Sequence, residues 1–271
     1  MVNDVKSRLV FHFYIPENWM TLASIKLHLS CLRHYAHIFD EATFILCLDD
    51  VLNTKLISEF EKEIINRGYH NVTFKVKPNS VLREAKTLKE EVIDKAADFD
   101  GLTFFGHSKG VGNEINGDIT YECLKDWVCG LYYFSLEFYE SEVIPHLYGY
   151  KGITYGPFKT FADWMDNKYH WYYSGGFFWI NGRRHLETVR RRNIMVPECS
   201  TRFYTENLLG DIYESYNLME EKREEECASH YNSYLTNISN FYTNVCDYIK
   251  LITYPEEYDN FVSFRENVAY K

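Results

Sequence analysis

The sequence predicts an α/β fold with a mostly parallel central sheet flanked by helices. Two observations lead to this expectation. Four short apolar segments have the length of buried strands, and segments with helical spacing of apolar residues separate them. Strands that alternate with helices in this way form parallel sheets with helices on their faces. We therefore expect a β-α-β-α-β-α-β unit over the first hundred residues or so.

The four strands are expected at 8–15, 42–48, 71–76 and 102–105. The intervening helices are expected at 21–39, 53–66 and 84–97. Asn53 or Thr54 can cap the second helix, and Gly68 can end it. No GxGxxG motif follows the first strand, which disfavours a dinucleotide-binding domain, and the lack of a GxxxxGKS or GxxxxGKT motif disfavours a P-loop enzyme.

The second part of the sequence is rich in aromatic residues and contains further helical and strand patterns. One long helix or two abutting helices are expected at 120–147. Strands are expected at 149–156 and 174–180, followed by a basic helix at 183–192 and helical patterns at 212–227 and 231–249. No linker or repeat interrupts the chain, so we expect one domain over residues 1–211 and a C-terminal helical extension over residues 212–271 that packs on it.

The composition limits the classes of partner. Hydrophobic residues make up 46% of the chain and charged residues 25%, as in ordinary globular proteins. The formal net charge of −10 argues against general affinity for nucleic acid or anionic lipid. The arginines within 183–192 are a local exception, which we interpret as a solvated helix face in preference to a patch that faces a membrane or a phosphate group.

The cysteines indicate a reducing compartment. Seven are present, without a CxxC pair or metal-ligand spacing, so buried reduced thiols are expected. Residues 1–18 do not read as a signal peptide, and no apolar run reaches transmembrane length. We therefore expect a cytoplasmic protein, with peripheral contact to the inner membrane as the alternative.

The stretch 101–117 carries the first candidate site. A buried strand ends at Gly106, and His107, Ser108, Lys109 and Gly110 follow it. In open α/β sheets, ligands bind beyond the carboxyl ends of the strands. A His and a Lys at this place, beside backbone that glycine leaves uncovered, suit an anionic ligand such as a diphosphate. A polar turn with a solvated Lys is the alternative.

Asp49 and Asp50 form a second candidate site, because they follow directly on the second strand. Two carboxylates at this edge can accept hydrogen bonds from uracil or ribose, or can hold a cation. Capping of the next helix would explain one of the two residues but not both.

A third candidate site lies in the sequence HWYYSGGFFWI, which begins at His170. His170 and two tyrosines precede Ser174, Gly175 and Gly176, which open a predicted strand. Glycines allow the backbone to approach a ligand closely, and aromatic rings suit the face of a sugar.

Together these motifs resemble those of bacterial glycosyltransferases of GT-A-like, Rossmann-like fold. HSKG after a strand, an aromatic helix with Trp127 and then HWYYSGGFFW are similar to the family pattern HTKG…W…HYSGNFWW. The resemblance covers residues 8–211, and it departs from the pattern at Ser108, Gly176 and Phe178. The first exchange keeps a hydroxyl group, and the other two would alter the choice of sugar or acceptor.

The resemblance implies a nucleotide-sugar donor and assigns roles to the candidate residues. It places His107, Ser108 and Lys109 where such enzymes often carry a metal-binding DxD, so His107 and Lys109 would offset the diphosphate charge in place of Mn²⁺ or Mg²⁺. A divalent metal stays an open alternative. Asp49 and Asp50 would face the nucleoside, and Ser174, Gly175 and Gly176 would line the donor sugar.

An inverting transfer also needs a base that deprotonates the acceptor hydroxyl. The resemblance implies an acidic acceptor-side residue at Glu206, with Asp211 and then His170 as alternatives. Glu206 also fits the first turn of a helix capped by Thr205, which would be a purely structural role.

Three functions follow from these observations. The first is a glycosyltransferase that moves a sugar from a nucleotide donor to a glycan or lipid-linked acceptor in bacterial surface polysaccharide biosynthesis. The second is a non-catalytic protein of the same fold that binds nucleotide sugars or glycans. The third, an α/β hydrolase, ranks last because the chain lacks a GxSxG elbow.

Overall fold

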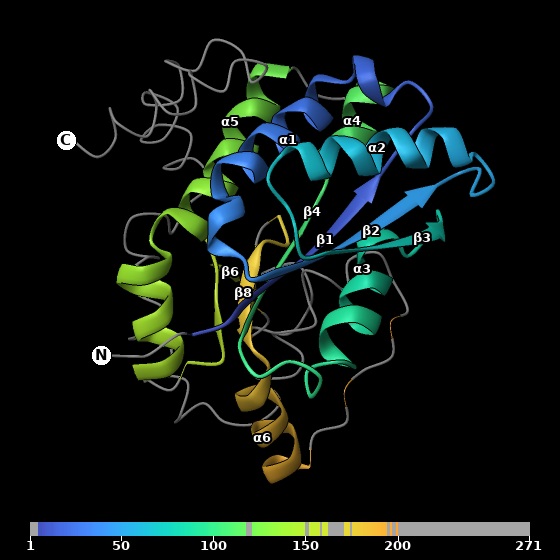
Figure 1. Ribbon diagram of the computed structural model, residues 1–271. Coiled ribbons are helices and arrows are strands. Elements are labelled where there is room, and N and C mark those ends of the chain that lie inside the picture. Colours follow the sequence, from blue (N-terminus) through green and yellow to red (C-terminus); the bar gives the residue numbers. More distant parts are fainter. Residues whose placement is uncertain are drawn as a thin grey trace.

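A computed structural model gives the fold of the chain (Figure 1). It describes residues 5–117, 121–149, 152–157, 159–161, 171–173 and 175–193, together with Val196 and Cys199. The domain division at residue 211, and the helices expected at 212–227 and 231–249, lie outside the described residues.

A six-stranded mixed sheet in the order β3-β2-β1-β4-β8-β5 forms the centre of the molecule. Its parallel strands are β1 (Ser7–Tyr14), β2 (Glu41–Leu48), β3 (Val72–Pro78) and β4 (Leu102–His107). The short strand β8 (Phe178–Asn181) runs antiparallel to β4 and to β5 (Thr154–Tyr155). A separate antiparallel pair joins β6 (Lys159–Phe161) to β7 (Trp171–Tyr173).

Helices cover both faces of this sheet (Figure 1). One face carries α1 (Ala23–Tyr35), α2 (Thr54–Asn66) and α5 (Tyr121–Tyr132), while the other carries α3 (Arg83–Thr87) and α6 (Gly182–Arg192). The short helix α4 (Val111–Asn116) follows β4. The described segments also contain short helical turns at Trp19–Thr21, Ala36–Ile38, Leu88–Ile93, Tyr133–Glu137, Tyr139–Val143 and Pro145–Gly149.

The alternation of side chains along β1 divides the core into two layers. Phe11 and Phe13 are fully buried in the larger layer, against α1, α2 and α5. Val10 points to the opposite face and packs with Phe105 in the smaller layer beneath α3. Because side chains of a strand alternate between faces, His12 lies on the same face as Val10. The burial of each Phe side chain stabilises the fold by about 1.5–3 kcal/mol.

The predicted α/β order is confirmed for the first 107 residues. All four strands are present, and the expected helix 53–66 begins after Asn53, whose side chain accepts a hydrogen bond from the backbone N–H of Leu56. The helix expected at 84–97 begins at Arg83 and continues as a π-helical turn to Ile93. The long helix expected at 120–147 is α5 followed by three π-helical turns.

The later strands are shorter than expected, and one of them is antiparallel to its neighbours. The pattern at 174–180 gives β8, which starts at Phe178 and is antiparallel to its neighbours. The pattern at 149–156 gives the two-residue strand β5. Local alternation of residues reveals a strand but not its direction, which depends on the length and path of the connection.

Cys31, Cys47 and Cys129 are buried thiols, as expected, whereas Cys199 is half-buried. Burial raises the pKa of the Cys47 thiol to about 11 and that of Cys31 well above its ordinary value. Within the described segments, none of the helices has the length and apolar character needed to span a bilayer.

Candidate functional site at the carboxyl ends of β1 and β4

The chain order of the parallel strands creates a crevice between β1 and β4. From β1 the chain proceeds outward to β2 and β3, and it then crosses back to place β4 on the other side of β1. The connections on the two sides of β1 therefore leave in opposite directions. At such a switch point, open α/β sheets bind ligands beyond the carboxyl ends of the strands.

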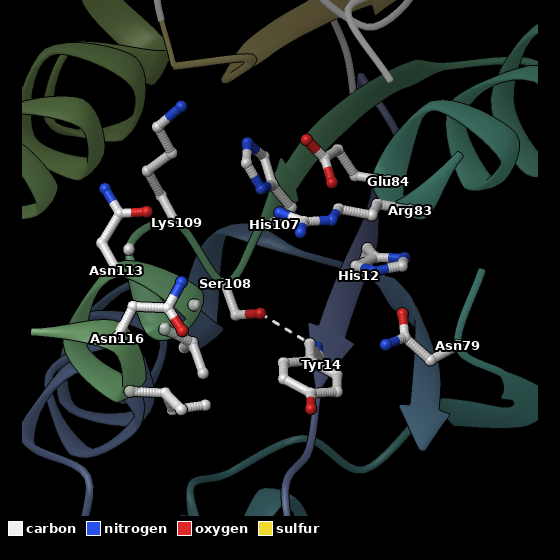
Figure 2. Close-up of a pocket in the computed structure, with 14 residues that line it drawn as sticks. His12, Tyr14, Asn79, Arg83, Glu84, His107, Ser108, Lys109, Asn113 and Asn116 are labelled. Atoms are coloured by element: carbon white, nitrogen blue, oxygen red, sulfur yellow. Dashed lines mark hydrogen bonds between the residues drawn. The ribbon is translucent and has the colours of Figure 1, made fainter. Parts of the chain in front are cut away.

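A pocket of about 330 Å³ lies at this switch point (Figure 2). Its walls come from β1, the loop after β3, the first turn of α3, the loop after β4 and α4. The residues that line it are mainly polar: His12, Tyr14, Asn79, Arg83, Glu84, His107, Ser108, Lys109, Gly110, Val111, Gly112, Asn113, Ile115 and Asn116. The structure thus brings four of the predicted site residues, 107–110, together in one pocket.

His12 and His107 lie opposite each other on β1 and β4 in the parallel register. The Nε2–H of His107 donates a hydrogen bond to the carbonyl oxygen of Gly175 at 2.8 Å, which leaves Nδ1 as the acceptor nitrogen. Nδ1 of His12 lies 2.9 Å from the hydroxyl oxygen of Thr87. The two imidazoles are therefore held by α3 on one side and by the Gly175 turn on the other.

Burial keeps both imidazoles neutral. It lowers the pKa of His12 to about 4 and that of His107 to about 3, and the positive charge of Lys109 contributes to the second shift. Near pH 7 neither ring carries a charge. The expected role of His107 in offsetting diphosphate charge therefore does not fit its environment, and His107 can instead offer Nδ1 as a hydrogen-bond acceptor.

The loop that carries Lys109 is held against β1 by hydrogen bonds of Ser108. The hydroxyl oxygen of Ser108 accepts a hydrogen bond from the backbone N–H of Tyr14 at 2.9 Å (Figure 2). The backbone N–H of Ser108 in turn donates to the carbonyl oxygen of His12 at 2.8 Å. These reciprocal bonds extend the pairing of β1 and β4 by one residue, so the backbone of the loop starts from a fixed position.

A buried histidine of α1 holds the other side of the same loop. The Nε2–H of His28 donates to the carbonyl oxygen of Lys109 at 3.0 Å, and Nδ1 accepts from the hydroxyl group of Tyr132 at 3.0 Å. Burial lowers the pKa of His28 to about 3, so the ring is neutral and this assignment of donor and acceptor is stable near pH 7. His28 therefore positions the backbone from which the Lys109 side chain extends.

The N-terminus of α1 is already occupied by a carboxylate of the protein. Glu114 of α4 accepts hydrogen bonds from the backbone N–H groups of Ala23 and Ser24, each at 2.9 Å. In dinucleotide-binding folds the pyrophosphate lies at the N-terminus of the first helix. The N-terminus of α1 is therefore not open to a phosphate, in agreement with the lack of a GxGxxG motif.

The predicted aspartates are exposed and are not among the residues that line the pocket. Asp49 accepts hydrogen bonds from the hydroxyl group of Tyr14 at 2.7 Å and from the side-chain amide of Asn79 at 3.0 Å. Burial and the bond to Asp49 raise the pKa of Tyr14 to about 12. Asp50 accepts from the backbone N–H of Leu52 and closes a turn. Asp49 thus orients two lining residues, whereas the contact of Asp50 is local and structural.

The turn before β8 reaches the pocket through His107. Gly175 and Gly176 have φ angles of +93° and +67°, which glycine adopts without strain. Neither lines the pocket, but the carbonyl oxygen of Gly175 is the partner of His107. Ser174 and the three predicted base candidates, Glu206, Asp211 and His170, lie outside the described residues. Within the described segments, no group of three or more His, Cys, Asp or Glu is placed to hold a metal ion.

Five lining residues lie outside the stretch 101–117 and were not predicted from the sequence: His12, Tyr14, Asn79, Arg83 and Glu84. A signal was present for two of them, since Tyr14 ends the first strand and Asn79 follows the third, as ligand-binding residues often do. No comparable signal marked Arg83, which lies in the first turn of a helix on the far side of a loop.

Comparisons with protein-family models, with curated proteins and with solved structures found no match to this chain.

Proposed function

We propose that the protein is a glycosyltransferase of GT-A-like fold that uses a nucleotide-sugar donor and a glycan or lipid-linked acceptor. The observation that carries the proposal is the polar pocket at the β1/β4 switch point, with Lys109 and Arg83 in its lining. Bacterial surface polysaccharide biosynthesis is the context that the HSKG and HWYYSGGFFW motifs suggest.

The architecture supports a nucleotide-binding half joined to a second half. The block β3-β2-β1-β4 has the strand order found in nucleotide-binding α/β sheets. The antiparallel strands β8 and β5 extend this sheet from the second half of the chain, and the Gly175 turn lies next to the pocket. This arrangement suits a donor that is bound by the first half while the second half approaches its sugar.

The chemistry of the pocket supports an anionic ligand with hydroxyl groups. With His12 and His107 neutral, the charged lining groups are two cations and the carboxylate of Glu84, which gives the pocket a net charge of about +1. The whole chain has a net charge of −10, so this positive site is a local exception. Neutral imidazoles and the amides of Asn79, Asn113 and Asn116 can bind sugar or ribose hydroxyls.

The test is a screen of the purified full-length protein against UDP-, GDP-, CMP- and dTDP-sugars, followed by an assay for nucleotide release. A ligand at one hundred times its dissociation constant stabilises the native state by about 2.7 kcal/mol, which is visible as a rise in melting temperature. We expect one nucleotide class to stabilise the protein and to be consumed in the presence of acceptor. Binding without turnover would favour the non-catalytic binding protein, and no binding of any donor would contradict the proposal.

We assign the base that deprotonates the acceptor to Glu206, with Asp211 and His170 as alternatives. Replacement of Glu206 by Gln is expected to abolish turnover and to leave donor binding unchanged, because a neutral amide cannot take the proton of the acceptor hydroxyl. Turnover that survives this replacement would move the assignment to Asp211 or His170.

A further inference from the structure

Arg83 has an unusual backbone conformation at the edge of the pocket. Its φ angle of +46° lies in the left-handed region, which costs a non-glycine residue about 1 kcal/mol or more. Such residues persist where the surrounding structure determines them, and they concentrate at ligand-binding sites. Here the conformation occurs in the first residue of α3, which lines the pocket.

The guanidinium group of Arg83 lines the pocket but has no partner within the described part of the chain: no hydrogen bond and no ion pair joins it to another described residue. By contrast, Arg67 pairs with Glu63, and Arg184 donates to the carbonyl oxygen of Tyr148. Among the described residues, none takes up the five N–H donors of Arg83, which can serve a ligand in the pocket.

Arg83 and Lys109 approach the paired histidines from two different walls. Both cations line the same pocket as the two histidines. Arg83 contributes to the lowered pKa of His12, and Lys109 contributes to the lowered pKa of His107. His12 and His107 are register partners on adjacent strands, which lie about 4.8 Å apart. In Figure 2 the His107 ring lies between the Lys109 side chain and the Arg83 guanidinium group.

We propose that Arg83 and Lys109 together bind the two phosphate groups of a diphosphate, one cation to each phosphate, from opposite walls of the pocket. The planar fork of Arg83 binds one phosphate through paired N–H groups, while Lys109 acts as a point charge on the other. The identification of this diphosphate with that of a nucleotide sugar rests on the proposed function, but the binding of two linked phosphates does not.

The same arrangement explains why a diphosphate fits better than a single anionic group. A monophosphate or a carboxylate brings one anionic group to the two cations, whereas a diphosphate brings one to each of them. The N-terminus of α1, the usual position for a phosphate, is filled by Glu114. Side-chain cations are therefore the groups that the described pocket offers to neutralise a ligand with two phosphates.

The experiment measures the affinity of the full-length protein for inorganic pyrophosphate and for orthophosphate by calorimetry, in the presence of EDTA. The variants are Arg83→Asn, Arg83→Gly and Lys109→Met, with Lys86→Gln as a matched control. Lys86 lies on the same helix, outside the pocket lining, and its removal also deletes one positive charge. Asn and Gly both tolerate a positive φ angle, so the first two variants remove the guanidinium group without adding strain.

We expect the wild-type protein to bind pyrophosphate more tightly than orthophosphate. Arg83→Asn, Arg83→Gly and Lys109→Met should each weaken pyrophosphate binding by about 10- to 100-fold, as loss of a hydrogen-bonded charge does. Lys86→Gln should bind as the wild type does, and Arg83→Gly should not lower the melting temperature by more than about 2 °C.

The proposal would be overturned if the wild type and Arg83→Asn bound pyrophosphate equally well. It would also be overturned if EDTA abolished binding by the wild type and Mn²⁺ restored it, or if no binding of pyrophosphate could be measured. Failure of the proposed function looks different. Pyrophosphate binding that depends on Arg83, in a protein that binds no nucleotide sugar, would uphold this inference and contradict the glycosyltransferase. Sugar transfer by Arg83→Asn with an unchanged KM for the donor would uphold the glycosyltransferase and contradict this inference.

Discussion

The carboxylate of Glu114 accepts a hydrogen bond from the backbone N–H of Ser24 at 2.9 Å and thereby joins α4, one wall of the pocket, to the first turn of α1. The same carboxylate accepts from Ala23. It therefore acts as the cap of a helix whose own N-cap residue, Leu22, has no side chain able to do so.

Replacement of Glu114 by Ala should lower the free energy of unfolding by about 1–2 kcal/mol, because two N–H groups at the positive end of α1 lose their acceptor. Chemical denaturation measures this change. Glu59→Ala is the control. Among the described residues, the ion pair of Glu59 is a long surface contact of 3.9 Å with Lys55, so its loss should cost no more than about 0.5 kcal/mol. If both replacements lowered the free energy of unfolding equally, the hydrogen bonds of Glu114 to α1 would not stabilise the fold more than a surface ion pair does.

Glu91 is the centre of an ion-pair network and should make stability depend on pH below about 4.5. It accepts hydrogen bonds from Lys75, Lys95 and Lys77 at 2.5, 2.6 and 3.1 Å, which lower the pKa of its carboxyl group to about 2 against the opposing effect of burial. The contribution is fully present above the unfolded pKa, and it is lost as the pH falls from about 4.5 to about 2.

The corresponding experiment compares acid unfolding of the wild type with that of Glu91→Gln. At pH 7 the variant should be less stable by about 2 kcal/mol, and the difference should shrink as the pH approaches 2. A difference that stays constant over this range would mean that the carboxyl group of Glu91 does not titrate as its ion pairs imply.

Buried neutral histidines should destabilise the fold at mildly acidic pH. Burial lowers the pKa values of His12, His28, His107 and His185 to about 4, 3, 3 and 4. The histidines of the unfolded chain are protonated near pH 6.5, whereas those of the native state stay neutral. The free energy of unfolding is therefore highest above pH 6.5 and decreases as the pH falls toward the folded pKa values. Each histidine contributes a slope of about 1.4 kcal/mol per pH unit.

Measurement of the unfolding free energy between pH 7.5 and 5 checks this prediction. His12→Gln should reduce the slope of the unfolding free energy against pH by the contribution of one histidine, about 1.4 kcal/mol per pH unit. A flat pH profile of the wild type in this range would contradict the burial of the imidazoles in a neutral state.

Asp49 and Asp50 should differ in their influence on ligand binding. Asp49→Ala removes the acceptor that orients Tyr14 and Asn79, and should weaken binding of the ligand in the pocket several-fold without altering the residues that touch it. Asp50→Ala removes a turn contact to Leu52 and should cost about 0.5–1 kcal/mol of stability with unchanged ligand affinity. The affinity for pyrophosphate and the melting temperature of each variant separate these two roles.

The sequence was informative about the strands because buried strands of a parallel sheet are continuous apolar segments. Phe44 and Phe104 lie in such segments, and both are fully buried. The direction of β8 could not be predicted, because its residues are equally suited to either direction. It is set by pairing with β4, far away in the chain.

The candidate site was predictable only in part, for a related reason. His107 and Lys109 follow the end of a strand and belong to the pocket as expected. Arg83, the first residue of α3, lines the pocket with a positive φ angle, and no local sequence pattern predicts this conformation. The charge state of His107 likewise depends on burial by Phe177 and the Gly175 turn, which come from the second half of the chain.

The antiparallel direction of β8 also affects the order in which the site is completed during synthesis. Because β8 runs against β4, the turn that precedes it arrives at the carboxyl end of β4, where Gly175 meets His107. A nascent chain that has emerged only as far as α4 already contains Arg83, Lys109 and both imidazoles, but His107 still lacks its carbonyl partner. We therefore expect the ligand-binding form to mature only after β8 has left the ribosome and paired, long after the parallel strands have been made.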